Sequence, residues 1–183
     1  MLNGMMPDIE VTNTITCGDN YVINYTKEAL QEILAWFDTR EFDIFFAGPA
    51  FMAGRYGVGC GLVCKAVAEK YGVPVITSMN EENPGVEEYK AVSYIFKGGR
   101  KATFMKDDLT LMANFAQKIA RGEPLLPAAQ ESYFITAIGD TAEREITITA
   151  KTNDEKFSDI CKVMITDKVV QRNISGPSRI APP

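Results

Sequence analysis

The chain has 183 residues, a formal net charge of -5 and no histidine. This length suits one domain with a core of its own, and the acidic balance argues against nucleic acid as a partner. The lack of histidine excludes Ser-His-Asp and Cys-His catalysis within the chain and removes the commonest metal ligand, so we expect no metal site.

The first predicted unit is a strand followed by a helix. Residues 9–17 alternate in polarity and are rich in β-branched side chains, a pattern that predicts a strand. In residues 25–37 the apolar side chains recur at helical spacing, at Leu30, Ile33, Leu34 and Phe37.

A β-α-β unit is predicted next. Residues 43–47 form a short continuous apolar run, as expected of a strand buried on both faces. A helix with one apolar stripe follows and should end at Gly72, in a left-handed cap. Residues 73–79 then read as the second strand, with Pro74 at its start. The stripe consists of Cys60, Val63, Cys64, Val67 and Tyr71.

The remaining elements are predicted with less regular spacing. Residues 91–96 read as a strand and residues 109–121 as a helix, which ends before Gly122 and Pro124. Farther on, residues 144–151 read as a strand, residues 157–165 as a short helix and residues 175–183 as an exposed tail or linker.

The alternation of strands and helices predicts an α/β fold. We expect a three-layer α/β/α sandwich with a mostly parallel sheet, Rossmann-like or flavodoxin-like. Residues 1–126 would form the parallel α/β domain with a cleft at its strand-end loops. Residues 127–183 would form a carboxyl-terminal extension, a strand plus a short helix, packed on the same domain.

A ligand site is expected where strands end, because open parallel sheets bind ligands outside their carboxyl ends. Three loops should meet there: residues 17–20, 48–57 and 80–85. The middle loop would have about ten residues, more than the ~2–6 usual for such connections. Its glycine pattern is neither the Rossmann fingerprint nor a P-loop. The loop backbone could pass close to a ligand at Gly48, Gly54 and Gly57, because glycine has no side chain.

Two kinds of side chain in these loops suggest chemistry. Arg55 offers a positive fork for a carboxylate, either of a ligand or of the protein at Glu81 or Glu82. Cys17 stands at a predicted strand end and is the candidate reactive thiol, with a structural role left open. Cys60 and Cys64 lie on an apolar helix stripe and are expected to pack in the core.

The cysteines and the amino terminus indicate a compartment. The four cysteines are too few and too irregular for a secreted disulfide framework, so free thiols in a reducing environment are expected. The first residues lack a secretory signal, and no apolar run approaches the ~20 residues of a membrane span. We therefore expect a cytoplasmic protein without membrane contact.

Three stretches carry a resemblance to a known family. They are CGDN at 17–20, DIFFAGPAFMAGRYGVGCGLVCKAV at 43–67 and GVPVITSMNEENPGVEEYK at 72–90. In order and spacing they resemble the amino-terminal part of the component B selenoprotein subunit of the glycine, sarcosine and betaine reductases. The agreement spans about half the chain, and the GPAF-AGRYG core with ENPG downstream is far more specific than a glycine count.

The resemblance implies a role in anaerobic amino-acid fermentation. Component B of these oxidoreductases binds an amine, a pyruvoyl group on a partner subunit engages it, and a selenocysteine cleaves the C-N bond. A second selenoprotein accepts the carboxymethyl group. This chain has no selenocysteine, has Met52 where the family suggests asparagine, and departs from the family over residues 128–183. The pyruvoyl group and the selenocysteine are therefore expected on a partner subunit or a missing segment.

The resemblance and the loop positions together give a set of candidate site residues. Arg55 would hold a substrate carboxylate, Asp19 or Glu82 would face the amine, and Tyr56 would add a cation-π face. The substrate-binding set is Cys17, Asp19, Asn20, Arg55, Tyr56, Glu82 and Asn83.

Three functional hypotheses remain open from the sequence. The chain is an amino-terminal fragment or stand-alone relative of an amine reductase subunit, a non-catalytic binding or assembly domain, or a racemase or lyase that uses Cys17 as acid or base. The last would need a second acid or base opposite that thiol. Expected partners are a small amine or amino acid, other reductase subunits and, as an open alternative, a second copy of the chain.

Overall fold

The computed structural model describes residues 2–134 in full, together with the backbone of four later stretches. In chain order the first part contains η1 (Leu2–Gly4), α1 (Asp19–Asn24), α2 (Thr26–Phe37), β1 (Phe45–Phe51), α3 (Gly54–Tyr71), β2 (Val75–Met79), α4 (Pro84–Tyr89), β3 (Tyr94–Lys97), η2 (Ala102–Phe104), α5 (Met105–Ala120) and α6 (Ala128–Glu131). The later stretches contain β4 (Arg144–Thr152), β5 (Glu155–Val163), β6 (Ile165–Thr166) and β7 (Val169–Val170).

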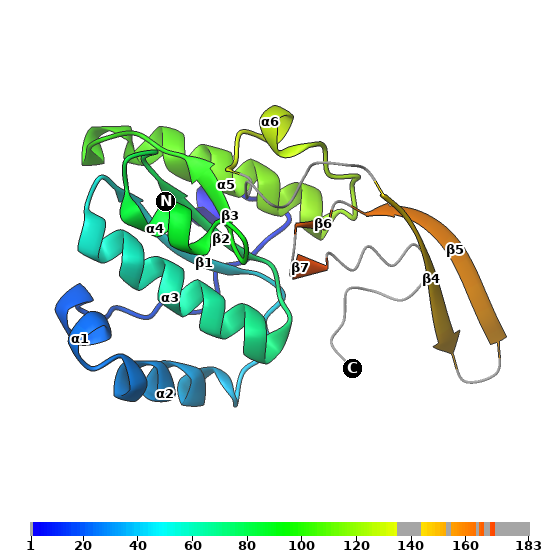
Figure 1. Ribbon diagram of the computed structural model, residues 1–183, viewed down its shortest axis with the longest axis horizontal. Coiled ribbons are helices and arrows are strands. Elements are labelled where there is room, and N and C mark those ends of the chain that lie inside the picture. The colour runs from blue at the N-terminus through cyan, green and yellow to red at the C-terminus, as the bar shows by residue number, and fades with distance from the viewer. Residues whose placement is uncertain (1, 135–143, 153–154, 164, 167–168, 171–183) are drawn as a thin grey trace.

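A three-stranded parallel sheet forms the middle layer. Its order is β1-β2-β3, and β2 pairs with both neighbours. Helices α3 and α4 cover one face, with α1 and α2 outside α3, and α5 covers the other (Figure 1). The predicted three-layer α/β fold is thereby confirmed.

The core lies on both faces of β2, whose five residues are all buried. Ile76 packs into the cluster of α5, with Phe96 and Phe115. Val75 points to the opposite face and packs with α2 and α3. This alternation is the two-residue period of a strand covered on both sides.

The turn from α3 into β2 forms as the sequence predicts. Gly72 caps α3 with a φ of 67°, a left-handed conformation that costs glycine little. Its N–H donates to the carbonyl of Ala68 at 3.0 Å. Pro74 then directs the chain into β2, and its carbonyl accepts the N–H of Phe45 at 3.0 Å.

The connection between β1 and α3 is shorter than predicted. β1 continues to Phe51 through an irregular register that contains the cis Gly48-Pro49 peptide bond, and α3 begins at Gly54. Only Met52 and Ala53 separate the two elements. The prediction of a ten-residue loop was wrong. Gly48 and Pro49 belong to the bulged end of β1, and Gly54 and Gly57 belong to the start of α3.

The predicted strand over residues 9–17 was also wrong, since no residue of this segment is in a helix or strand. A strand exists only where a neighbour accepts its hydrogen bonds, and β1 pairs with β2 alone. Within the segment, the N–H of Val11 instead donates to Oδ1 of Asn3 at 2.8 Å.

The carboxyl-terminal part contains β5 where a helix was predicted, and the short strands β6 and β7 were not predicted. β4 confirms the strand expected over residues 144–151. The short helix predicted over residues 157–165 was wrong, because residues 157–163 belong to β5, which pairs antiparallel with β4. A short run of apolar and polar residues fits either structure, and the cross-strand pairing decides. The predicted tail, residues 175–183, lies outside the described residues.

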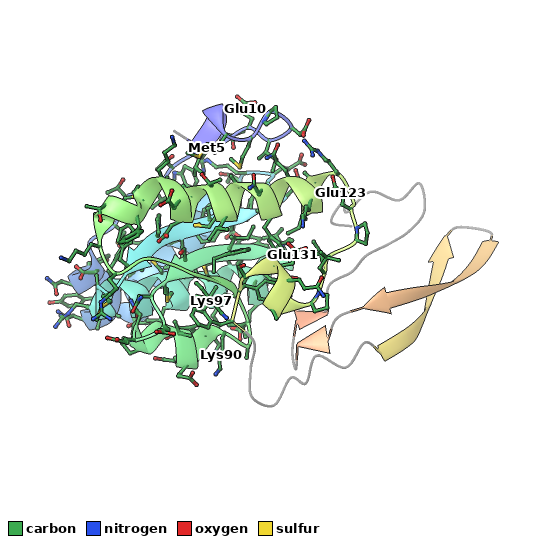
Figure 2. All side chains as sticks on the ribbon, turned by 90° about the horizontal axis from the view of Figure 1, so that it is seen from above. Met5, Glu10, Lys90, Lys97, Glu123 and Glu131 are labelled. Carbon is green, nitrogen blue, oxygen red and sulfur yellow. The ribbon has the colours of Figure 1, made fainter. Side chains whose placement is uncertain are left out.

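Residues 128–134 cover the outer edge of β3. The N–H of Phe134 donates to the carbonyl of Ile95 at 2.9 Å, and the N–H of Lys97 to the carbonyl of Ser132 at 3.0 Å. Figure 2 shows Met5 and Glu10 on the α5 side of the domain, opposite Lys90 and Lys97. In the described part of the chain, no helix has the length and apolar character to cross a membrane.

The packing of α3 on α4 leads to a first prediction. A Cβ added at Gly61 would lie 2.0 Å from the ring of Tyr89, which is buried. One added at Gly59 would meet Val22 at an ordinary 3.8 Å. We expect Gly61→Ala to lower the free energy of unfolding by about 1–3 kcal/mol. Gly59→Ala should leave it unchanged or raise it by up to ~1 kcal/mol through helix propensity.

Urea unfolding of the two variants followed by circular dichroism checks this contrast. The same amino acid is introduced in the same helix, so helix propensity contributes equally and only the contact with Tyr89 differs. Equal stabilities would show that α4 does not press on α3 as the structure has it.

Candidate functional site

Arg55 and Asn20 join two of the predicted loops. Arg55 lies in the first turn of α3, and its Nη1 donates to Oδ1 of Asn20 at 2.6 Å. Asn20 follows Asp19, which begins α1 and accepts the N–H of Asn20 at 2.8 Å. The bond fixes the guanidinium at the carboxyl edge of the sheet, beside the start of α1.

The alternative pairing of Arg55 with Glu81 or Glu82 is not formed. Glu82 accepts a hydrogen bond from Nη1 of Arg100 at 2.6 Å, and both side chains are more than half exposed. An ion pair in such contact with water contributes at most about 1 kcal/mol. Glu82 is thus directed to the end of β3, away from the Arg55–Asn20 pair.

A long groove brings other predicted residues together. Its volume is about 1340 Å³, and it runs between the amino-terminal segment and the outer side of β1. Cys17, Asp19, Tyr56 and the backbone of Gly48 all line it. Arg55 and Asn20 are absent from its lining, as are Glu82 and Asn83.

Tyr56 presents an aromatic face at this groove. Its side chain is 39% exposed. Burial of the hydroxyl, helped by the neighbouring Cys60 thiol, raises the pKa of Tyr56 to about 12. The phenol therefore stays neutral at physiological pH and serves as an apolar face with one hydroxyl.

The thiols of α3 are core groups. Burial raises the pKa of Cys60 to about 11 and raises that of Cys64 as well. Both therefore remain protonated at neutral pH, as the apolar stripe predicts. Cys17 is half-buried, and its Sγ has one weak contact, to the carbonyl of Gly18 at 3.8 Å.

Asn83 is a structural residue at the start of α4. Only 2% of it is exposed. Its Nδ2 donates to the carbonyls of Phe51 at 2.9 Å and Ala53 at 3.3 Å, and its Oδ1 accepts the N–H of Gly85 at 3.0 Å. A Cβ at Gly57 would lie 2.2 Å from this amide, so the glycine serves helix packing.

Sequence reasoning missed a buried carboxylate at the end of β3. Asp108 lies in the first turn of α5 with 2% exposed, and its Oδ1 accepts the N–H of Gly99 at 3.1 Å. Burial raises the pKa of this carboxyl, while the Gly99 N–H and the Ser78 hydroxyl oppose the rise. Asp107 and Asp108 stand before an apolar stripe, a pattern typical of a helix start. That pattern does not reveal the burial of Asp108, which depends on the loop at Gly99.

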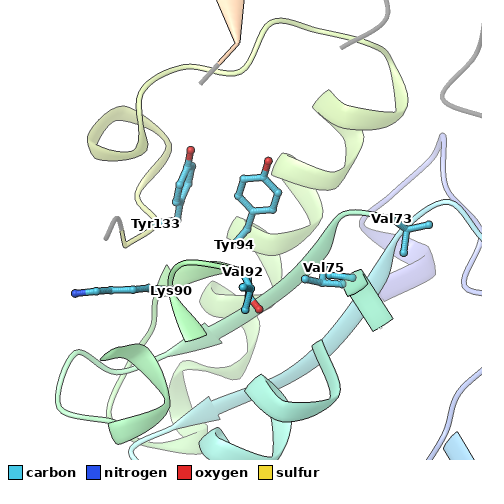
Figure 3. Close-up of a pocket in the computed structure, with 8 residues that line it drawn as sticks. Val73, Val75, Lys90, Val92, Tyr94 and Tyr133 are labelled. Atoms are coloured by element: carbon cyan, nitrogen blue, oxygen red, sulfur yellow. The ribbon is translucent and has the colours of Figure 1, made fainter. Parts of the chain in front are cut away.

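A small pocket lies among the amino ends of β2 and β3. It has a volume of about 20 Å³ and is lined by Val75, Val92, Tyr94, Tyr133 and others (Figure 3). Such a space holds about one water molecule. It is too small for a substrate. Among the described residues, no group of three or more His, Cys, Asp or Glu side chains could hold a metal ion.

The chain matches a family and several relatives. The family described as "Glycine/sarcosine/betaine reductase selenoprotein B (GRDB)" matches residues 1–173. The match therefore extends well into residues 128–183, where we expected the chain to depart from the family. The betaine reductase complex component B subunit beta of Peptoclostridium acidaminophilum is 52% identical over 73% of this chain and 31% of its own length. The sarcosine reductase complex component B subunit beta of that organism is 36% identical, over 88% of this chain and 39% of its own length.

A third relative extends the same pattern. The glycine reductase complex component B subunit gamma of Peptoclostridium acidaminophilum is 41% identical over 72% of this chain and 30% of its own length. The chain thus spans between about 30% and 40% of these relatives. No solved structure gave a significant match. The family match over nearly the whole chain and the identity to these complex components show that the chain belongs to the glycine/sarcosine/betaine reductase selenoprotein B family.

Proposed function

We propose that this chain supplies substrate-binding loops to an amine reductase of the glycine, sarcosine or betaine type, for reductive C-N cleavage. The observation that carries the proposal is the hydrogen bond between Arg55 and Asn20. It fixes a cation at the carboxyl edge of a parallel sheet, the usual place for a ligand in such folds.

This cation and the residues next to the Arg55–Asn20 pair in the sequence suit a small zwitterion. The guanidinium has five N–H donors, and its 2.6 Å bond to Asn20 uses one of them. The others are available for the carboxylate that glycine, sarcosine and betaine share. Asp19 is the favoured partner for the amine, because Glu82 is engaged by Arg100. The exposed ring of Tyr56 would receive a methylated ammonium.

Covalent chemistry is assigned to other parts of the complex. A cysteine attacks as the thiolate, and the buried Cys60 and Cys64 do not fit this role because burial raises the pKa of each. The pyruvoyl group and the selenocysteine are thus proposed to come from a partner subunit or from a segment outside this chain. The residues of this chain would bind and orient the amine.

Isothermal titration of glycine, sarcosine and betaine into the purified chain tests the proposal. Arg55→Ala should weaken binding by roughly 10–100-fold, because a charge-assisted hydrogen bond is lost. Lys65→Ala removes the same charge from an exposed site on the same helix and should leave affinity unchanged. Equal affinities of Arg55→Ala and the unaltered chain would contradict the proposal.

Substitutions of Tyr56 separate the ring from the hydroxyl. Tyr56→Phe should retain betaine binding, whereas Tyr56→Leu should weaken it by roughly 2–30-fold through loss of the cation-π contact. Glycine binding should change less, because its compact ammonium is held by hydrogen bonds instead. If Tyr56→Leu lost affinity for betaine and glycine equally, the ring of Tyr56 would not contact the methylated ammonium as proposed.

A further inference from the structure

The sheet has one covered edge and one unpaired edge. Residues 132–134 bond to β3, whereas β1 has no strand beside its outer side among the described residues. Phe45 donates its N–H toward β2, to the carbonyl of Pro74. Because successive strand residues alternate their direction, the N–H and carbonyl of Phe46 point to the outer side. Unpaired strand edges of this kind template the addition of another strand.

The large groove lies along this edge. β1 lines it with Phe45, Phe46 and Ala47, and residues 8–17 line it as well. Side chains of both helix layers contribute too, with Val63 from α3 and Ile119 from α5. The groove is therefore in the plane of the sheet, between helices that cover its two faces. With about 1340 Å³ it could admit an extended segment of several residues.

The amino-terminal segment has strand-like sequence without a strand partner. Residues 9–17 alternate β-branched and polar side chains but make no ladder. An added strand beside β1 would offer hydrogen bonds on its far side, where this segment lies. The same added strand could then hydrogen-bond to the backbone of β1 on one side and to the backbone of this segment on the other.

The charges at one end of the groove indicate the chemistry of the occupant there. Glu41 and Asp43, which directly precede β1, line it, as do Glu10 and one cation, Arg40, whose guanidinium lies over the ring of Trp36. The three carboxylates outnumber this cation. They form no ion pair within the described residues, whereas Asp8 is paired with Arg121. Both strand pairs of the sheet are parallel, so we take an added strand to run in the same direction. Its first residues would then lie beside Glu41 and Asp43, and a lysine or arginine at its amino end is favoured.

We propose that the groove beside β1 receives a parallel β-strand from another polypeptide chain, in which a lysine or arginine precedes about six apolar, mainly β-branched residues. A strand buried on both faces is apolar throughout. This inference goes beyond the binding of a small amine and does not rest on it, because the contacts along β1 involve neither Arg55 nor Asn20. Asp19 and Tyr56 line the same groove, so a bound strand and a bound amine would lie close together.

A synthetic peptide fused to a soluble carrier tests the inference. It carries two lysines followed by about six alternating valine and isoleucine residues, and binding to the full chain is measured by titration. The matched control has the same side chains, with N-methyl groups on alternate amides of one edge. We expect the control to bind about tenfold more weakly or worse, because ladder hydrogen bonds are blocked. Equal binding would show mere hydrophobic adhesion and overturn the proposal.

Hydrogen exchange locates the contact. On addition of the peptide, exchange of the Phe46 amide should slow, while that of Ala47, which faces β2, should change little. A double variant, Glu41→Gln with Asp43→Asn, should weaken binding severalfold at low salt. Glu69→Gln, on the exposed face of α3, should not. Unchanged exchange at Phe46 would overturn the proposal.

Sedimentation of the chain alone tests whether a second copy occupies the groove. The proposal expects a monomer whose groove is free for the peptide. A concentration-dependent dimer that the peptide fails to dissociate would show that a second copy is the occupant, and the proposal would fall. Loss of amine binding in Arg55→Ala would leave these results unaffected, so the two proposals fail separately.

Discussion

Phe115→Ala is expected to lower the free energy of unfolding by about 3–5 kcal/mol. Phe115 lies on α5 with 2% of its surface exposed. The centroid of its ring lies 4.7 Å from the ring centroid of Tyr94, 5.2 Å from that of Phe96 and 5.6 Å from that of Tyr133. The substitution removes the ring that holds α5, β3 and residues 128–134 together, and the surrounding side chains can fill the space only in part.

Phe104→Ala is the matched control, because the same atoms are removed from a residue that is 46% exposed. We expect a loss below about 1 kcal/mol there. Urea unfolding followed by circular dichroism gives both values. If Phe115→Ala leaves no folded protein, Phe115→Leu should still unfold cooperatively, at a lower urea midpoint than the unaltered chain. Equal losses at Phe115 and Phe104 would contradict the observed packing of α5.

The elements that the sequence predicted best are those whose signal is local. The spacing of Ile33 and Phe37 predicted α2, which occupies Thr26–Phe37. Gly72 marked the end of α3, and the structure places it in a left-handed cap. In each case the residues that decide the structure lie within one or two turns of one another, so a single sequence is sufficient.

The errors arise where a distant partner decides. Residues 9–17 have the composition of a strand, but β1 does not pair with them, and no local pattern reveals whether a partner is adjacent. β5 reads equally well as a short helix, and its pairing with β4 settles its form. Within the protein, Arg55 was expected to pair with Glu81 or Glu82, but its partner is Asn20, 35 positions earlier in the chain.

The candidate site follows the same division. The sequence placed Cys17, Asp19 and Tyr56 in strand-end loops, and the structure gathers them along one groove. It also grouped Asn83 with them, although the amide of that residue is buried. The Asn-Pro-Gly pattern is a signature of a helix start as well as of a loop near a ligand, because asparagine is a preferred cap and proline suits the first turn.

Asn83→Ala is expected to lower the free energy of unfolding by about 2–4 kcal/mol. The substitution removes the cap of α4, worth about 0.5–2 kcal/mol. It also leaves the carbonyls of Phe51 and Ala53 without the Nδ2 donor that they share, at a cost of about 1–3 kcal/mol for a buried group. Thermal or urea unfolding measures the total.

Asn83→Asp separates the two contributions. Aspartate is as good a cap as asparagine, but at neutral pH it has no donor and sets a negative charge against two carbonyls. If the cap alone mattered, the free energy of unfolding of this variant would equal that of the unaltered chain. We expect a loss of about 2 kcal/mol or more at pH 7. Asn13→Asp, at an exposed position, should cost little.

The pH dependence of Asn83→Asp supplies a further check. Burial and the facing carbonyls should raise the pKa of the introduced carboxyl in the folded state above its unfolded value. A raised folded pKa means that the folded state binds the proton more tightly, so the deficit relative to the unaltered chain should shrink as pH falls through that pKa. If Asn83 instead contacted substrate, Asn83→Ala would weaken amine binding at unchanged stability. The hydrogen bonds to Phe51 and Ala53 predict the reverse order of effects, with lost stability as the primary change.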